Sequence, residues 1–375
     1  MKLSSWEMDA ISSLEKKRSE FYFMLSKYGR ECYQRDAKEY LNKGNTMFFS
    51  DKQQEALNSF WGTYLPDYNS LYHQFYYNAC GYFDIQFIPD DVYASFIDGY
   101  FNNRTIEAGF SDKNYFDLIL SGFRMPKTYV HVINGSTLGA SYQQLTENEC
   151  VELLYSVGDF IVKPSVASYG GSNVRRFLHS TKAEIKSIFS GECQNIIIQE
   201  YINQSSVTES LHKASLNSIR IMTLMLNNKV ETLSPILKMG INDSIVDNAS
   251  SGGIFCGIKN GVLDAVAYDA TGHKYYSHPN GCSFAGTVIP SIESVKKLVK
   301  DAALRFPHFR LIGWDVALNY NDEPVIIEAN LAMSSIDMIQ LCCGPLFGDH
   351  TKAVLDEVFS SAGANQAHMD LTQYI

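Results

Sequence analysis

Two short apolar runs near the end of the chain, residues 311–318 and 324–330, carry oxygen-bearing side chains in positions that suit a divalent cation. A turn-rich segment separates the runs, which is typical of a β-hairpin. Because strand side chains alternate between faces, Glu328 and Asn330 point the same way, and a turn centred on the middle of the segment places Asp315 opposite Glu328. Opposed carboxylates repel each other unless a cation lies between them.

Two carboxylates and one amide oxygen are hard ligands of the kind that bind Mg²⁺ or Mn²⁺. The sequence therefore predicts a divalent metal site formed by Asp315, Glu328 and Asn330. The alternative is a solvated face with a neutral glutamate or a neighbouring lysine. The apolar character of both strands favours the metal site, because it indicates that the strands are buried.

Three cations and a glycine loop add groups that suit a polyphosphate. Lys113 falls in the first turn of a predicted helix, where a cation opposes the helix dipole. Lys163 and Arg220 interrupt apolar strands, where a buried cation needs an anionic partner or ligand. The loop at 165–173 lets backbone N–H groups surround phosphate oxygens, but it matches neither the P-loop nor the dinucleotide-binding motif. A flexible surface hairpin explains the loop equally well.

The composition argues against several other classes of function. The net charge of −10 argues against a nucleic-acid-binding protein that relies on basic charge. No run of about 18 apolar residues predicts a membrane span, and the first residues lack the apolar core of a signal peptide. The eight cysteines are scattered without CxxC pairs, which indicates reduced thiols and a cytoplasmic protein. Covalent catalysis is not indicated, because there is no GxSxG motif and no cysteine with an evident histidine partner.

Apolar periodicity predicts the elements that position these residues. Aromatic residues are dense from 61 to 101, which is typical of a core or a domain interface. Helices are expected at 8–43, from 51, from 89, from 112, at 145–156, at 182–189 and at 291–305. Strands are expected at 125–133, around Lys163, up to Leu178, at 195–202, at 216–226, at 233–239 and after 253, with a hairpin turn at Asn260 and Gly261.

The ordered set of motifs resembles the ATP-grasp superfamily, and most closely the sugar-transfer-associated ATP-grasp proteins of polysaccharide biosynthesis. The matching stretches are 111–114, 162–164, 216–220, 247–248 with 252–253, 278–279, 313–315 and 327–330. The likeness runs from about residue 70 to residue 345. It implies an α+β ATP-grasp fold, in which two α+β subdomains clasp ATP behind an N-terminal helical, aromatic-rich region. The expected parts are a helical region at 1–105, a lid-side subdomain at 106–198, a C-terminal subdomain with the metal hairpin at 199–360, and a tail at 361–375.

The resemblance also implies roles for single residues. The nucleotide-binding residues would be Lys113, Lys163, Ser168, Gly170, Gly171, Ser172, Gln199, Glu200, Tyr201, Ile202 and Lys238. Gln199 to Ile202 would form the hinge strand along the adenine, and the glycine loop would close over the phosphates. Asp315, Glu328 and Asn330 would hold Mg²⁺ against the phosphates, with Arg220 beside the transferred phosphoryl group. No residue is implied for the ribose, because Ser205 follows Gln204 where relatives often have a histidine.

The acceptor side is expected to lie in one cleft beside the metal hairpin. Its residues would be Asn217, Arg220, Asn248, Gly252, Gly253 and His278. His278 precedes a proline in a loop, so we expect its side chain to be exposed. As a base it would take the amine proton, which makes His278 a candidate catalytic residue with Arg220 and Lys163. An ordinary loop histidine is the alternative reading.

These features favour a ligase that joins a carboxylate to an amine through an acyl phosphate, using ATP and Mg²⁺. Such chemistry depends on positioning and charge neutralisation more than on a nucleophilic side chain. The family context suggests a carbohydrate carboxylate such as a uronic acid, or an amino acid to be attached to a sugar. A kinase that phosphorylates a hydroxyl would use the same metal site, and a non-catalytic nucleotide-binding module is a third possibility.

Overall fold

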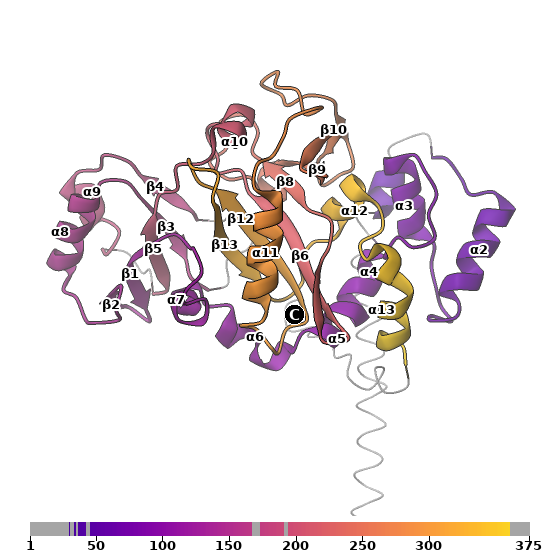
Figure 1. Cartoon of the computed structure of the whole chain (residues 1–375), viewed down its shortest axis with the longest axis horizontal. Coiled ribbons are helices and arrows are strands. Elements are labelled where there is room, and N and C mark those ends of the chain that lie inside the picture. The colour runs from indigo at the N-terminus through magenta and orange to yellow at the C-terminus, as the bar shows by residue number, and fades with distance from the viewer. Residues whose placement is uncertain are drawn as a thin grey trace, which may run out of the picture. The chain divides into compact units, whose positions relative to one another are not determined.

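The structure is a computed structural model that describes residues 30, 34, 37–42, 46–166, 173–190 and 194–360. Contacts divide the chain into two compact units. The first comprises the described residues of Met1–Arg104 and Gly344–Ile375, and the second is Thr105–Cys343. In Figure 1 the first unit carries α2 to α5 and α13, and the second carries both β-sheets. No described helix is long and apolar enough to cross a membrane.

The first unit is helical and has an aromatic core. Its α2 begins after Ser50, whose side chain forms a capping box with Gln53, as the acidic and glutamine-rich start of this segment predicts. Trp61 and Phe87 are fully buried, and the Trp61 indole donates to the carbonyl oxygen of Ile85 at 2.8 Å. The helices are α2 (Asp51–Trp61), α3 (Leu71–Cys80), α4 (Asp90–Val92), α5 (Asp98–Phe101) and α13 (Thr351–Val358). The dense aromatic segment therefore forms a core, as expected.

The second unit contains a smaller sheet of five antiparallel strands in the order β2-β1-β5-β3-β4. One face packs against α8 and α9 through Val130, Val162 and Ile198. Because side chains alternate, the neighbouring residues Lys163 and Gln199 occupy the opposite face. The bounds are β1 (Thr128–Ile133), β2 (Ser136–Gly139), α8 (Glu147–Val157), β3 (Phe160–Pro164), β4 (Arg175–Phe177), α9 (Lys182–Lys186) and β5 (Ile196–Glu200).

A larger sheet has the strand order β11-β10-β9-β8-β6-β12-β13, and β7 also pairs with β6. The amphipathic α11 packs across β6 and β12 over a continuous apolar core (Figure 1). The strands are β6 (Ile219–Leu226), β7 (Lys229–Thr232), β8 (Ile236–Met239), β9 (Ile254–Lys259), β10 (Val262–Tyr268), β11 (Lys274–Tyr275), β12 (Leu311–Leu318) and β13 (Pro324–Asn330). The helices of this unit outside the smaller sheet are α6 (Arg104–Phe110), α7 (Phe116–Ile119), α10 (Ser206–Leu211), α11 (Ile292–Ala303) and α12 (Asp337–Cys343), of which α6 starts one residue before the unit does.

Most predicted elements are present within the described residues. Residues 37–42 are helical, whereas most of the helix expected at 8–43 and all of the expected tail at 361–375 lie outside the described residues. The hairpin turn at Asn260 and Gly261 joins β9 to β10, with positive φ at both residues. The hairpin of β12 and β13 is also present, with Asp315 paired directly to Glu328. The boundaries proposed from sequence between the lid-side and C-terminal subdomains stay a prediction.

Candidate active site

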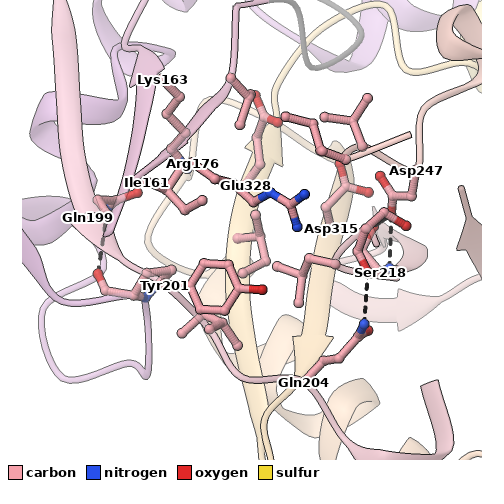
Figure 2. Close-up of a pocket in the computed structure, with 18 of the residues that line it drawn as sticks. Ile161, Lys163, Arg176, Gln199, Tyr201, Gln204, Ser218, Asp247, Asp315 and Glu328 are labelled. Atoms are coloured by element: carbon pink, nitrogen blue, oxygen red, sulfur yellow. Dashed lines mark hydrogen bonds between the residues drawn. The ribbon is translucent and has the colours of Figure 1, made fainter. Parts of the chain in front are cut away.

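A pocket of about 230 Å³ lies between the two sheets of the second unit. The smaller sheet contributes residues of β3, β4 and β5, and the larger sheet contributes residues of β8, β12 and β13 (Figure 2). Lysines and carboxylates line one part of the pocket, and the end of β5 lines another. The described lining residues include neither histidine nor cysteine.

The acidic hairpin forms one wall of the pocket. Asp315 and Glu328 are directly opposed and both line it. The Asn330 amide nitrogen lies 3.4 Å from Asp315 Oδ2 and 3.1 Å from the carbonyl oxygen of Gly313. The three side chains therefore lie together on one face. Among the described residues, no group of three or more histidines, cysteines, aspartates or glutamates is placed to hold a metal ion. A metal site at this hairpin would therefore need the Asn330 amide as a third ligand.

Buried cations hold Asp315 ionised. Arg220 is opposite Asp315 on the neighbouring β6 and binds it in a bidentate manner, with distances of 2.8 Å and 2.9 Å. Lys238 Nζ lies 3.3 Å from Asp315 Oδ1. Burial raises the pKa of Asp315, but Arg220 and Lys238 outweigh this effect and hold the pKa well below its usual range. Asp315 and Glu328 bring carboxylate oxygens opposite one another, which are hard donors of the kind that a divalent cation binds, and the neighbouring lysine of the alternative reading is also present, as Lys113 beside Glu328.

Two lysines lie beside the hairpin. Lys113 Nζ forms an ion pair with Glu328 Oε1 at 2.8 Å, and its backbone N–H donates to the carbonyl oxygen of Ser165. Burial and the nearby charge of Lys113 lower the pKa of Lys163 to about 8, against the opposing effect of Glu328. Asp112 caps the turn that carries Lys113, which agrees with the predicted helix start. The lysine expected in a strand and the lysine expected at a helix start thus meet in one pocket.

The end of β5 lines the pocket with four consecutive residues, Gln199 to Ile202. The Gln199 amide donates to Thr128 Oγ1 at 3.1 Å, and Glu200 Oε2 accepts from the backbone N–H of Lys127. Figure 2 shows the ring of Tyr201 reaching into the pocket. The expected hinge segment is therefore at the pocket, and its contact with adenine stays a prediction.

A second polar network lines the wall formed by β8 and the loop after it. Lys238 Nζ lies 3.0 Å from Asn248 Oδ1 and 3.5 Å from Asp247 Oδ1. The other oxygen of Asp247 accepts from the backbone N–H and the hydroxyl of Ser218. Lys238 and Asn248, both expected at the site, are pocket-lining residues, and Lys238 is fully engaged with protein groups in this structure.

Several predicted acceptor residues do not line the pocket. The expectation that His278 is exposed is wrong, because its side chain is 1% exposed and its Nε2 lies 2.8 Å from the carbonyl oxygen of Gly240. Burial also lowers the pKa of His278. Asn217 is 1% exposed, and its amide donates to three oxygens of the α10 region. Both side chains are held in the interior because each hydrogen-bonds to buried backbone carbonyl groups of another segment.

The glycine pair has a structural role as well. A Cβ at Gly253 would lie 2.4 Å from the carbonyl oxygen of Asp247, so glycine permits a close turn there. Neither Gly252 nor Gly253 lines the pocket, and the expectation of one cleft that includes Asn217, both glycines and His278 is wrong. Arg220 does not line the pocket, and it is connected to the pocket through its hydrogen bonds to Asp315. Ser168, Gly170, Gly171 and Ser172 lie outside the described residues, and their roles stay predictions.

Several pocket residues were missed from the sequence, among them the charged residues Arg176, Glu209 and Lys213. Arg176 on β4 lines the pocket directly opposite Ile161 of β3. The available signal for Arg176 was the strand that follows the glycine loop. Because strand side chains alternate between faces, Val174 and Arg176 lie on the face that carries Lys163, and Arg175 lies on the other.

Two antiparallel sheets that enclose a lysine-rich pocket, with paired acids on one hairpin, make up the ATP-grasp fold in this chain. A sequence model of the family described as sugar-transfer associated ATP-grasp matches residues 93–354, and the chain belongs to that family. Among curated proteins, none gives a significant match.

Solved structures of ATP-grasp ligases are similar to this chain at low identity. The ATP-grasp ligase PsnB, complexed with minimal precursor, Mg and ADP, is 14% identical with a TM-score of 0.40, over 68% of this chain and 62% of that one. D-cycloserine synthetase DcsG is 14% identical with a TM-score of 0.40, over 67% and 70%. D-alanyl-alanine synthetase A from Vibrio cholerae is 14% identical with a TM-score of 0.36, over 66% and 67%. The chain thus spans less than two thirds of the PsnB chain.

Proposed function

We propose that this chain is an ATP- and Mg²⁺-dependent ligase that activates a carboxylate as an acyl phosphate and joins it to an amine. The observation that carries the proposal is the charge array at the pocket. Arg220, Asp315 and Glu328 lie side by side on three neighbouring strands, and Lys113 and Lys163 face them. An array of paired acids and clustered lysines suits the phosphates of a nucleotide with a bound cation.

The nucleotide would lie between the end of β5 and this array. Backbone groups of residues 199–202 would bind the edge of the base. Lys113 and Lys163 would bind the phosphates, since both lysines line the pocket. Two lysines close together repel each other, so an anion between them lowers the energy of the site.

Asp315, Glu328 and Asn330 would hold Mg²⁺. The cation would neutralise phosphate charge and align the γ-phosphorus with the acceptor. Arg220 would keep Asp315 oriented and ionised, which the bidentate contact already does in this structure.

The reaction would need no covalent enzyme intermediate. A substrate carboxylate oxygen attacks the γ-phosphorus of ATP, ADP leaves, and an acyl phosphate forms. The amine then attacks the carbonyl carbon, phosphate leaves, and the amine proton passes to solvent. This route fits a pocket whose described lining holds no histidine and no cysteine. The family description suggests that the carboxylate or the amine belongs to a sugar or uronic acid in polysaccharide biosynthesis.

Product analysis tests the proposal. The protein is incubated with ATP and Mg²⁺ and a panel of uronic acids and amino acids, each alone and in carboxylate–amine pairs, and ADP and phosphate are quantified. A ligase releases both products only when a carboxylate and an amine are present together. Release of ADP without phosphate, with transfer to a hydroxyl, would instead show a kinase. Lys163→Met provides the inactive control, because it keeps the volume of the side chain and removes the charge.

A further inference from the structure

Arg176 belongs to a row of side chains that crosses the smaller sheet and faces the pocket. It is paired with Ile161 of β3, and Ile161 is paired with Gln199 of β5. Paired residues on antiparallel strands share a face, and all three residues line the pocket. Figure 2 shows the guanidinium group of Arg176 extending into the space between the two sheets.

The guanidinium group has few protein partners. Within the described part of the chain, no carboxylate lies within 4.0 Å of its nitrogens, and its one hydrogen bond runs from Nη1 to the carbonyl oxygen of Ala214 at 2.7 Å. Ala214 lies in the segment between α10 and β6, so this contact joins the two walls of the pocket. A half-buried guanidinium without a carboxylate leaves its flat faces available to a ligand.

The position of Arg176 along the sheet indicates which part of a ligand it would meet. Ile161, its partner, is two residues before Lys163 on β3, and two residues of a strand span about 7 Å. Arg176 therefore lies away from the lysines, in the part of the pocket lined by Ile161 and Gln199. If the phosphates lie at Lys163, the nucleobase lies at Arg176.

We propose that Arg176 is a nucleobase-binding residue, whose guanidinium plane packs against the purine ring of the bound nucleotide. The inference rests on the proposed function, because it takes ATP as the ligand of this pocket. Arginine packs favourably on aromatic faces, and the hydrogen bond to Ala214 restricts the rotation of the side chain. Arg176 would thereby supply the stacking surface on the β4 side of the base.

The chain offers a matched control for a binding experiment. Arg175 precedes Arg176 on the same strand but is exposed on the opposite face, and its guanidinium lies 5.5 Å from the Phe177 ring. Arg176→Ala, Arg176→Lys and Arg175→Ala are compared with the wild type by calorimetric titration with adenosine, AMP, ADP and ATP. Binding is measured directly, so no acceptor substrate is needed.

A stacking contact predicts the same loss for every ligand in the series. We expect Arg176→Ala to raise Kd by about tenfold for adenosine, AMP, ADP and ATP alike. Arg176→Lys should show most of this loss, because it keeps the charge without the planar group, and Arg175→Ala should bind as the wild type does. Lys163→Met should weaken binding more with each added phosphate.

Two results would overturn the assignment. A loss that grows from adenosine to ATP in Arg176→Ala would make Arg176 a phosphate ligand, and unchanged affinity in a folded variant would remove it from the site. If Arg176→Ala does not fold, Arg176→Lys decides between the same outcomes. A wild-type protein that binds no adenine nucleotide would refute the proposed function itself, which is a separate result.

Discussion

Lys163 allows a quantitative prediction about the pH dependence of ATP binding. Its pKa is lowered to about 8 by burial and by Lys113 in the ligand-free protein, and bound phosphates would raise that pKa again. The charged amine that binds the phosphates is present below pH 8 and is lost above it. With a pKa of about 8, the protonated fraction of Lys163 is about nine tenths at pH 7 and about one tenth at pH 9.

The affinity for ATP should therefore fall by about tenfold between pH 7 and pH 9, by about twofold up to pH 8 and by about fivefold from pH 8 to pH 9. Binding should also take up about half a proton at pH 8 and about 0.9 proton at pH 9. Calorimetric titrations at constant Mg²⁺ and ionic strength, repeated in buffers of different ionisation enthalpy, measure the affinity and the proton uptake together.

Two variants separate Lys163 from other groups. Lys163→Met should bind ATP more weakly at pH 7 and show no further loss up to pH 9. Lys213→Met should keep the wild-type profile, because Lys213 also lines the pocket but its side chain is 85% exposed. Constant affinity across this range in the wild type, or an unchanged slope in Lys163→Met, would refute the reasoning.

Four further variants test the ion pairs and the buried histidine. Arg220→Met leaves the buried carboxylate of Asp315 without its bidentate partner and should lower the free energy of unfolding by about 3 kcal/mol in chemical denaturation, whereas the double variant with Asp315→Leu should recover most of the loss. A fully stable Arg220→Met would contradict this pairing. Glu328→Gln should weaken ATP binding by about tenfold or more with Mg²⁺ and spare binding without Mg²⁺; an equal loss in both conditions would argue against a metal ligand. Burial lowers the pKa of His73 to about 3, so as the pH falls the unfolded state takes up a proton on this histidine before the folded state does. The free energy of unfolding should therefore fall below pH 6.5 by about 1.4 kcal/mol per pH unit. His73→Gln should remove this slope, and an identical slope in both proteins would exclude His73 as its source.

The parts of the fold that local chemistry decides could be predicted from the sequence. Capping boxes at Ser50 and Thr146 start α2 and α8, because a cap depends on residues three positions apart. The acidic hairpin followed from alternation and from a turn of suitable composition. The polar strand β7 was missed, because its pairing with β6 is decided by the neighbouring strand and not by its own apolar pattern.

Some residues of the candidate site could likewise be predicted from the sequence, and others could not. Lys113 and Lys163 were found because a lysine is unusual at a helix start and in an apolar strand, whereas Lys238, Asn248 and the hinge residues were found through the resemblance to the family. His278 was misjudged, because a loop position predicts exposure while a hydrogen bond to Gly240, which lies 38 residues earlier in the chain, buries the ring. Asn217 was misjudged for the same reason, since the carbonyl oxygens that bind its amide belong to the α10 region.

The sequence by itself determined the family, the hairpin with its two opposed acids, and the presence of lysines suited to phosphate. These features are properties of residue type and short spacing, which the chain carries before it folds. Only the tertiary structure decided that Arg220 binds Asp315, 95 residues away, and that Arg176 faces the pocket while Arg175 does not face it. Both depend on strand register between distant segments, and register is set by the packing of whole sheets against their helices.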